Sequence, residues 1–360
     1  CGFLRQRHPA HRLMPATFAE RLLAWFDEHG RKDLPWQQQR TPYRVWISEI
    51  MLQQTQVGTV TPYFERWMQA FPDVPTLAAA PLDEVLSHWS GLGYYARARN
   101  LHRAAIRCVE DHGGDLPQGA EALGTLPGIG LSTANAIVSQ STDQPAAVLD
   151  GNVRRVLARH AAVEGWTGQA VVQKQLWLEA EMRLPARRGA DYTQAIMDLG
   201  AMLCTRSKPG CARCPVRGDC QARLRGLVSQ LPTPKPATRI SDRTVHLLII
   251  RDGNGRVLLE KRPPAGIWGG LWCLPDGESI DAIERRLGLA AEKPATLPRF
   301  EHRLSHVRMT ICPALADAAK PTQVQCPASR GWFEHRQLPQ LGLPKPVTDL
   351  LNRLHDGEFD

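Results

Sequence analysis

The sequence predicts a multidomain protein in which an all-α region precedes an α+β domain. From Phe18 to about Leu224, apolar residues recur every three or four positions and are interrupted by Pro and Gly, which indicates about ten helices and no strand. The stretch QLPTPKPATRISDR that follows is rich in Pro, basic and without periodicity, so we interpret it as a linker. Beyond it, TVHLLII and RVLLEKR flank the turn sequence RDGNG, which predicts a β-hairpin.

The composition favours an acidic partner. The net charge is +8 over 360 residues and the pI is about 9.2, which suits nucleic acid first and an anionic membrane second. No apolar run approaches the roughly 20 residues of a membrane span, and the first residues lack the apolar core of a signal peptide. We therefore expect a soluble, intracellular protein.

The first chemically informative segment is SEIMLQQTQV, in which Glu49 lies on what otherwise resembles a buried helix. Burying an unpaired carboxylate costs several kcal/mol, so we expect Glu49 to be buried, to stay protonated and to be able to donate a proton. The amides of Gln53 and Gln54 follow at once, and no apolar pattern explains them. We expect them to face a partner.

The next segment, SGLGYYARARNLHRAA, places two glycines before Tyr94 and a series of arginines after it. An aromatic ring beside a flexible turn suits stacking on bases, and Arg97, Arg99 and Arg103 on one helix suit phosphate contacts. The alternative is the start of an ordinary buried helix.

A hairpin between two helices is predicted at LGTLPGIGLSTANAI. One helix ends at Leu126, and the next begins near Ser132. Gly128 and Gly130 allow the backbone to approach a phosphate closely, next to the N–H groups of the second helix. The pattern predicts a helix–hairpin–helix that binds duplex DNA without reading its sequence. A tight turn between two helices is the alternative.

A second carboxylate, Asp150, stands in AVLDGNVRRVLAR. It can cap a helix beginning near Asn152, and it can also form a pair with Glu49. The two roles are compatible, because backbone N–H groups would hold a capping aspartate rigid and ionised. Two carboxylates in opposite protonation states are the recurring solution for glycosidic cleavage, and a nucleobase must be turned out of the stack before it can leave.

Four of the nine cysteines are clustered as C-x6-C-x2-C-x5-C, and these are Cys204, Cys211, Cys214 and Cys220. Four thiolates at such spacing can close on one Zn ion or one [4Fe–4S] cluster, and the single C-x2-C arm favours the cluster. Arg206, Lys208, Arg213 and Arg217 surround these cysteines and would present positive charge to a phosphate backbone.

Together these segments resemble the adenine DNA glycosylases of the MutY family, within the endonuclease III-like helix–hairpin–helix superfamily. The segments VWISEIMLQQTQV, GLGYYARARNL, LPGIG, LDGNVRRVLAR and MDLGAMLCTRSKPGC occur in the order found in that family. The resemblance implies an N-terminal helix (14–34), a six-helix barrel module with the hairpin (35–146), an iron–sulfur cluster module (147–226), a linker (227–243) and a Nudix-like lesion-recognition domain (244–360).

The resemblance also implies roles for individual residues. Glu49 matches the general acid that protonates adenine N7, and Asp150 matches the carboxylate that stabilises the sugar cation or adds to it transiently. Asn152 matches an amide residue of the family's active site, and Trp36 matches an aromatic residue that forms the wall of its pocket. The expected DNA contacts are Gln53, Gln54, Tyr94, Gly128, Gly130, Arg154, Ser305 and His306, and the expected [4Fe–4S] ligands are the four clustered cysteines.

Ser132 separates two branches of the superfamily. Relatives with lyase activity carry a Lys at this position, which forms a Schiff base with the sugar. Because this chain has Ser132, and because the endonuclease III branch lacks an acid at the position of Glu49, the resemblance implies a monofunctional glycosylase. Its implied partner is double-stranded DNA containing adenine opposite 8-oxoguanine or guanine, bound by a monomer in a bacterial-type cytoplasm at the nucleoid.

The C-terminal domain is similar to the Nudix-like fold with which this family reads 8-oxoguanine. The helix expected around Asp281 to Leu287 contains AIERRLG and lacks the adjacent Glu pair that a Nudix hydrolase needs for Mg²⁺, so recognition is the remaining role. The lesion-reading loop of the family is Phe-Ser-His, whereas this chain has Leu304 before Ser305 and His306. Two other functions stay open: a DNA-binding module without chemistry, and a Nudix-type pyrophosphatase.

Overall fold

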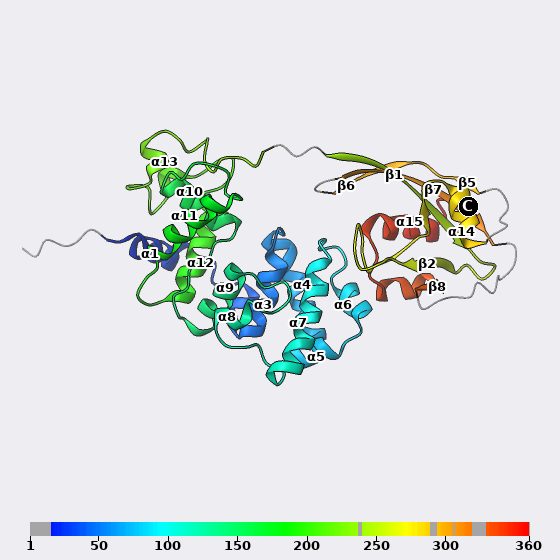
Figure 1. Ribbon diagram of the computed structural model, residues 1–360, viewed down its shortest axis with the longest axis horizontal. Helices are drawn as coiled ribbons and strands as arrows, with labels where there is room; N and C mark the ends of the chain where they lie inside the picture. Colours follow the sequence, from blue (N-terminus) through cyan, green and yellow to red (C-terminus); the bar gives the residue numbers. More distant parts are fainter. Residues whose placement is uncertain (1–15, 237–239, 289–293, 305–306, 319–328, 360) are drawn as a thin grey trace, which may run out of the picture. The chain divides into compact units, whose positions relative to one another are not determined.

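The structure is a computed structural model that describes residues 16–236, 240–288, 294–304, 307–318 and 329–359 (Figure 1). The chain divides into two compact units. The first unit joins the residues before Thr41 to Leu131–Lys235, and the second joins Thr41–Gly130 to the residues from Pro236 onward. None of the helices that the structure describes is long and apolar enough to cross a lipid bilayer.

The fully described stretch from Phe18 to Leu224 is helical and contains no strand, as expected. Three of its helices (α2, α8 and α13) have only four residues, too few for a periodic pattern, and this explains why about ten helices were expected instead of thirteen. The α-helices are α1 (Phe18–His29), α2 (Pro35–Gln38), α3 (Pro42–Leu52), α4 (Val57–Ala70), α5 (Val74–Ala79), α6 (Leu82–His88), α7 (Ala96–His112), α8 (Ala120–Leu123), α9 (Leu131–Thr142), α10 (Gly151–His160), α11 (Ala170–Glu181), α12 (Gly189–Asp198) and α13 (Gln221–Leu224). A π-helix, η1 (Leu199–Leu203), continues α12, and a short 3₁₀-helix, η2 (Cys211–Arg213), lies in the cysteine segment.

The first unit packs α1 against helices that come more than a hundred residues later. A capping box starts α1: the Thr17 hydroxyl accepts from the Glu20 N–H, and the Glu20 carboxylate accepts from the Thr17 N–H at 2.7 Å. The buried face of α1, including Leu22 and Phe26, belongs to one core with apolar residues of α10, α11 and α12. This core supports the segments that carry Asp150 and the four cysteines.

The helical part of the second unit is built around three fully buried tryptophans, Trp46 on α3, Trp67 on α4 and Trp89 after α6. Trp67 meets Trp89 edge to face, with ring centroids 5.6 Å apart. Since Trp46 lies one helical turn before Glu49 and Ile50, this packing sets the orientation of the helix that carries Glu49.

The C-terminal part forms a mixed β-sheet, with eight strands among the described residues. The predicted hairpin is confirmed as β1 and β2, which pair antiparallel from Arg251 and Val257. The longest pairing joins β1 to β7 in parallel, from Ser241 opposite Val307 to Arg251 opposite Asp317. The strands are β1 (Ser241–Arg251), β2 (Val257–Lys261), β3 (Trp272–Cys273), β4 (Asp276–Gly277), β5 (Ala295–Thr296), β6 (Phe300–Arg303), β7 (Val307–Asp317) and β8 (Arg330–Phe333).

Both faces of this sheet are covered. Alternate residues of β1 enter different cores: Leu247 and Ile249 pack with α15 (Lys345–His355), whereas Leu248 and Ile250 pack with α14 (Ile280–Leu287). The helix expected around Asp281 is thus confirmed as α14, and a short 3₁₀-helix, η3 (His335–Gln340), precedes α15. The fold class predicted from the sequence, a helical core followed by an α+β domain, is confirmed.

Candidate functional site

Asp150 caps the N-terminus of α10. Its Oδ1 accepts a hydrogen bond from the Val153 backbone N–H at 2.7 Å, which confirms the predicted cap. Burial nevertheless raises the pKa of the Asp150 carboxyl above its usual range, although the N–H groups of Val153 and Asn152 act in the opposite direction. Desolvation therefore outweighs the capping hydrogen bonds in the direction of the pKa shift, and the ionised form of Asp150 stays a prediction. A carboxylate in this position interacts strongly with any cation placed beside it.

The segment that leads into Asp150 is held on both sides by side chains. The Ser132 hydroxyl on α9 accepts from the Leu149 N–H at 2.9 Å, and the Arg154 Nε donates to the Leu149 carbonyl at 3.1 Å. Asn135, also on α9, donates to the Ala147 carbonyl at 2.6 Å. Ser132 thus has a definite structural task, and Arg154, expected to contact DNA, uses one of its N–H groups within the protein.

Asn152 lies two residues after Asp150 and is linked to the cysteine segment. Its Oδ1 accepts from Arg155 Nη2 at 2.8 Å, and Arg155 Nε donates to the Cys204 carbonyl at 2.6 Å. Gly200 of η1 lies so close to α10 that an added Cβ would stand 2.7 Å from the Asn152 Cβ. The π-helical turn therefore brings the chain before Cys204 against the start of α10.

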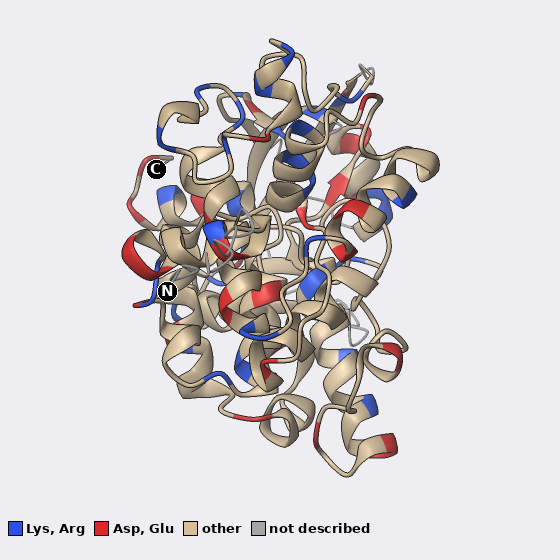
Figure 2. Cartoon of the chain, turned by 90° about the vertical axis from the view of Figure 1, so that its left-hand side faces the viewer, with Lys and Arg blue, Asp and Glu red and all other residues tan. Residues whose placement is uncertain are grey.

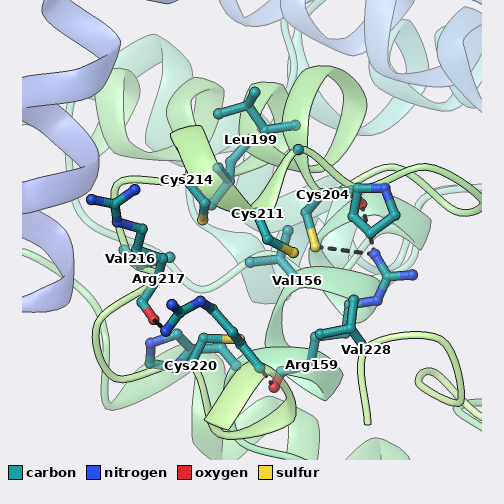
Figure 3. Close-up of a pocket in the computed structure, with 15 residues that line it drawn as sticks. Val156, Arg159, Leu199, Cys204, Cys211, Cys214, Val216, Arg217, Cys220 and Val228 are labelled. Atoms are coloured by element: carbon teal, nitrogen blue, oxygen red, sulfur yellow. Dashed lines mark hydrogen bonds between the residues drawn. The ribbon is translucent and has the colours of Figure 1, made fainter. Parts of the chain in front are cut away.

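The four clustered cysteines line one cavity with about 440 Å³ of empty space, its open mouth included. Figure 3 shows their sulfur atoms around a common space between α10, η1 and the loop before α13. The remaining lining is largely apolar, and Arg159 Nη1 lies 3.4 Å from the Cys204 Sγ. Burial raises the pKa of the Cys214 thiol to about 11, so a bound metal centre is what would stabilise these groups as thiolates. The donor set fits such a centre.

The cysteine loop is basic at its surface. Lys, Arg, Asp and Glu are interspersed along the chain in Figure 2, but the residues between Cys204 and Cys220 include four basic side chains and one acidic one. Those four basic residues, Arg206, Lys208, Arg213 and Arg217, are all exposed. This arrangement suits a polyanion.

Glu49 lies on α3, which begins with Thr41 as its cap and Pro42 in its first turn. Its neighbours Ser48 and Ile50 are buried, but Glu49 itself is half-buried. The expectation of full burial was therefore wrong: a position that a helical pattern marks as internal keeps access to solvent here. Glu49 belongs to the second unit and Asp150 to the first.

The residues expected to enter the duplex lie on two turns. Gln53 ends α3 and is half-buried, whereas Gln54 and Tyr94 are exposed. Gln54 has φ +59° and Tyr94 has φ +49°. This is a left-handed backbone conformation that residues other than glycine rarely adopt. Arg97 was expected to contact phosphate, and this was wrong: it is buried, and its guanidinium donates to backbone carbonyls around both turns. Arg103 is exposed and donates to Asn100 at 2.6 Å.

The predicted hairpin places two exposed glycines on either side of the buried Ile129. Gly128 has φ +81°, and an added Cβ would stand 2.8 Å from the Asn100 Cβ. A Cβ on Gly130 would meet nothing within 4 Å. Only Gly128 is therefore required by the backbone, while Gly130 leaves open space in front of the first turn of α9.

The chain matches two protein-family models. Residues 47–181 match the HhH-GPD superfamily of base excision DNA repair proteins, and residues 246–353 match the NUDIX domain. The first range contains Glu49, the hairpin and Asp150, and the second contains the mixed sheet except for the first residues of β1.

Curated relatives match nearly the full chain. An adenine DNA glycosylase of Buchnera aphidicola subsp. Baizongia pistaciae is 35% identical over 94% of this chain and 97% of its own length. The human adenine DNA glycosylase is 35% identical over 82% of this chain and 66% of its own length. The chain belongs to the adenine DNA glycosylase family. Members of this family are enzymes of DNA repair that hydrolyse N-glycosyl bonds.

Solved structures of other glycosylases share the helical fold. A thermostable thymine-DNA glycosylase is 28% identical, with a TM-score of 0.53 over 58% of this chain and 95% of the other. A trapped endonuclease III–DNA covalent intermediate is 21% identical, with a TM-score of 0.50 over 58% of this chain and 95% of the other. The second likeness concerns the fold alone.

The segment expected to read the lesion is described only in part. Leu304, which the resemblance sets at the position of the family's Phe, packs against the core that β1 forms with α15, and its N–H donates to the Val307 carbonyl at 2.8 Å. Ser305 and His306 lie outside the described residues. Leu304 therefore serves the domain core, where an apolar side chain is stable without stacking on a base.

The sequence patterns did not indicate the burial of two polar residues that lie beside or among the expected site residues. Trp36 is buried on α2 as a pocket wall would be, and next to it Gln37 is buried with no hydrogen-bond partner for either amide atom among the described residues. The sequence PWQQQR contains only a run of amides and no signal that one of them is internal. The second residue is Arg97, whose position in a series of arginines suggested a surface role.

Proposed function

We propose that this glycosylase removes adenine paired with 8-oxoguanine or guanine in duplex DNA. It does so by hydrolysing the N-glycosidic bond of an adenosine nucleotide that has been flipped out of the stack. The observation that carries the proposal is Asp150, a half-buried residue whose carboxyl has a raised pKa and is fixed by Val153 and by the hydrogen bonds to Leu149, in a chain that belongs to the adenine DNA glycosylase family.

In the proposed reaction, Glu49 donates a proton to adenine N7. The bond between the sugar C1′ and adenine N9 then breaks, its electron pair leaves with the base, and an oxocarbenium ion forms at C1′. Asp150 stabilises this cation or adds to it transiently. Water attacks C1′ and gives up a proton to a carboxylate, so that the products are adenine and an abasic sugar. Asn152 and Trp36 would hold the flipped nucleotide.

We propose that the enzyme is monofunctional. A lyase needs an amine that forms a Schiff base with the sugar, and Ser132 at the corresponding position offers only a hydroxyl. This hydroxyl accepts the Leu149 N–H, so its role is to hold the segment before Asp150. The abasic product is thus expected to remain uncleaved until alkali or another enzyme acts.

Cys204, Cys211, Cys214 and Cys220 would hold a [4Fe–4S] cluster. When bound, the cluster links its four ligands and so fixes the basic loop between them. Replacing Cys211 by Ser should lower the iron content and the visible absorption of the purified protein. Replacing Cys312, a half-buried cysteine of β7, is the matched control and should leave both unchanged.

Ser305 and His306 would read the 8-oxoguanine, on the basis of the family resemblance of the segment RLSHVRM. The enzyme would act as a monomer on nucleoid DNA. Because Leu304 takes the place of the stacking aromatic, we expect Leu304→Phe to strengthen the preference for 8-oxoguanine over guanine.

Single-turnover excision on a duplex with adenine opposite 8-oxoguanine tests these proposals. Strand breaks that appear only after alkali support a monofunctional glycosylase, and breaks without alkali would show that another amine acts as a lyase. Glu49→Gln and Asp150→Asn should both bind this duplex and lose nearly all excision. Excision at the parental rate in either variant would exclude the mechanism, and binding without excision by the parent protein would favour a DNA-binding module.

A further inference from the structure

Arg97 lies in the first turn of α7 with only 9% of its surface exposed, and its guanidinium is directed at two separate turns. Toward the end of α3, Nη1 lies 2.8 Å from the Ile50 carbonyl, 2.9 Å from that of Met51 and 2.7 Å from that of Gln53. The last carbonyls of a helix lack partners within it, so a cationic donor at this place closes the end of the helix that carries Glu49.

The other terminal nitrogen of Arg97 serves the second turn. Nη2 lies 3.1 Å from the Leu92 carbonyl and 3.2 Å from that of Gly93, and 3.3 Å from the Thr55 hydroxyl. The guanidinium also lies 5.1 Å from the ring centroid of Trp89 and 5.6 Å from that of Tyr94. One planar side chain thus holds the two turns together.

The carbonyls that Arg97 binds have a specific relation to the exposed residues. Gln53 comes directly before Gln54, and Gly93 comes directly before Tyr94; both following residues have positive φ. Such a conformation costs on the order of 1–3 kcal/mol for a residue other than glycine, and it persists only where the surroundings impose it. Arg97 supplies hydrogen bonds to the peptide before each strained residue.

We propose that Arg97 is a positioning residue that holds Gln54 and Tyr94 in the conformation in which they open the DNA duplex. The proposal rests on the proposed function, because the flipping of a base out of the duplex is the step in which Gln54 and Tyr94 would act. Burial lowers the pKa of Arg97 to about 10, so the guanidinium stays charged at neutral pH. Arg97 touches no reacting atom and acts only through the two turns.

The test measures duplex opening without excision. A duplex carries adenine opposite 8-oxoguanine, with 2-aminopurine next to the adenine, and the emission of 2-aminopurine rises when its neighbour leaves the stack. Binding is followed by anisotropy in Glu49→Gln protein, which cannot excise the base. We expect Glu49→Gln to raise the emission at saturation, and Glu49→Gln with Arg97→Met to bind the duplex without this rise.

The choice of variants separates positioning from charge and from general stability. Arg97→Lys keeps the charge but has a single nitrogen, which cannot reach both turns, so it should fail like Arg97→Met. Tyr43→Phe removes a buried hydrogen bond to the Phe71 carbonyl, 2.8 Å long, from the same helical unit, and it should keep the emission rise. Circular dichroism checks that each variant is folded.

Excision kinetics supply the second readout. With Glu49 intact, Arg97→Met should slow excision by about 100-fold in a fully paired duplex. The loss should be less than about 10-fold when mismatches flank the lesion, because opening then costs less. An equal loss on both duplexes, a normal emission rise in Arg97→Met, or rescue by Arg97→Lys would overturn the proposal. Absence of excision by the parent protein, with a normal emission rise in Glu49→Gln, would instead refute the proposed function alone.

Discussion

At the scale of single residues, the pKa of Asp150 results from two opposing effects. Capping hydrogen bonds from α10 favour the carboxylate, and burial favours the neutral acid; burial prevails. The charge that the proposed reaction needs is thus maintained at a cost in folding free energy. An oxocarbenium ion beside the carboxylate would reduce that cost, because the two opposite charges attract. The carboxylate would therefore stabilise the transition state more than the ground state.

Asp150→Asn is therefore expected to stabilise the fold at neutral pH while abolishing excision. Asn caps a helix about as well as Asp, and it removes the charge whose pKa burial raises. Because the pKa of Asp150 is raised in the folded state, its ionisation destabilises the protein as the pH rises from the unfolded pKa to the folded one. Thermal unfolding of both proteins across pH should show an advantage for Asn that grows over this window and is constant above it. A variant less stable than the parent at neutral pH would contradict this.

Ser132→Ala provides a second test at the residue scale. The change leaves the Leu149 N–H without the acceptor that lies 2.9 Å away, and an unsatisfied buried N–H costs about 1–3 kcal/mol. We expect lower stability in chemical denaturation and slower excision, since the segment before Asp150 loses one of its supports. Ser141→Ala on the same helix is the control, because the Ser141 hydroxyl only donates to the Ile137 carbonyl within α9. Equal effects of the two changes would argue against a specific role for Ser132.

At the scale of elements, the hairpin before α9 shows how similar glycines can have different duties. Gly128 is held at a positive φ against Asn100, and Gly130 is not. From LPGIG alone the two are equivalent, because the pattern contains no information about what the rest of the chain places beside each. The structure makes Gly128 a requirement of the fold and leaves open space at Gly130, where the phosphate contact stays a prediction.

Gly128→Ala should destabilise the protein, by about 1–3 kcal/mol, because Ala must adopt the left-handed conformation and its Cβ would clash with Asn100. Gly130→Ala should leave stability within about 0.5 kcal/mol, as expected for a change that meets no neighbour. Its effect on non-specific duplex affinity then tests the phosphate contact separately. A stable Gly128→Ala protein would show that the turn can relax.

At the scale of the whole molecule, each unit joins segments that are far apart in the sequence. The first unit is fastened by Arg31, between α1 and α2, whose N–H and Nε lie 2.8 and 2.9 Å from the carboxylate of Asp198 on α12. Asp198 is fully buried and also accepts from Gln194 at 2.8 Å. This contact spans 167 residues of sequence and leads directly into the π-helix before the cysteines.

Asp198→Asn should cost about 3 kcal/mol, because it removes the fully buried carboxylate and leaves the half-buried Arg31 cation without its counter-charge. Asp191→Asn on the same helix is the control: Asp191 is partly exposed beside Arg188 and Arg40, and such pairs contribute about 1 kcal/mol or less. Denaturant unfolding followed by circular dichroism measures both changes. Similar losses of unfolding free energy in the two variants would refute the expectation that Asp198 contributes more to stability than Asp191.

The sequence by itself determined those features of this protein that depend on local chemistry. The cap at Asp150, the turn RDGNG, the glycine-rich hairpin and the cysteine spacing are each encoded within a few residues, so their patterns could be recognised without the fold. The activity was predicted from the segments that resemble the adenine DNA glycosylase family. Chain-wide helical periodicity likewise predicted the helical and α+β parts correctly.

Only the tertiary structure decided which of these residues are exposed and what they contact. Arg97 occurs in a basic series yet is buried beneath two turns, Glu49 occurs in an apolar series yet is half-buried, and Leu304 is half-buried against the domain core. Arg97 donates to the Gln53 carbonyl, which is 44 residues away in the sequence, and Leu304 packs against a core that includes residues of β1 and α15. Periodicity reports only the helix or strand to which a residue belongs, whereas burial and hydrogen-bond partners are set by what packs against it.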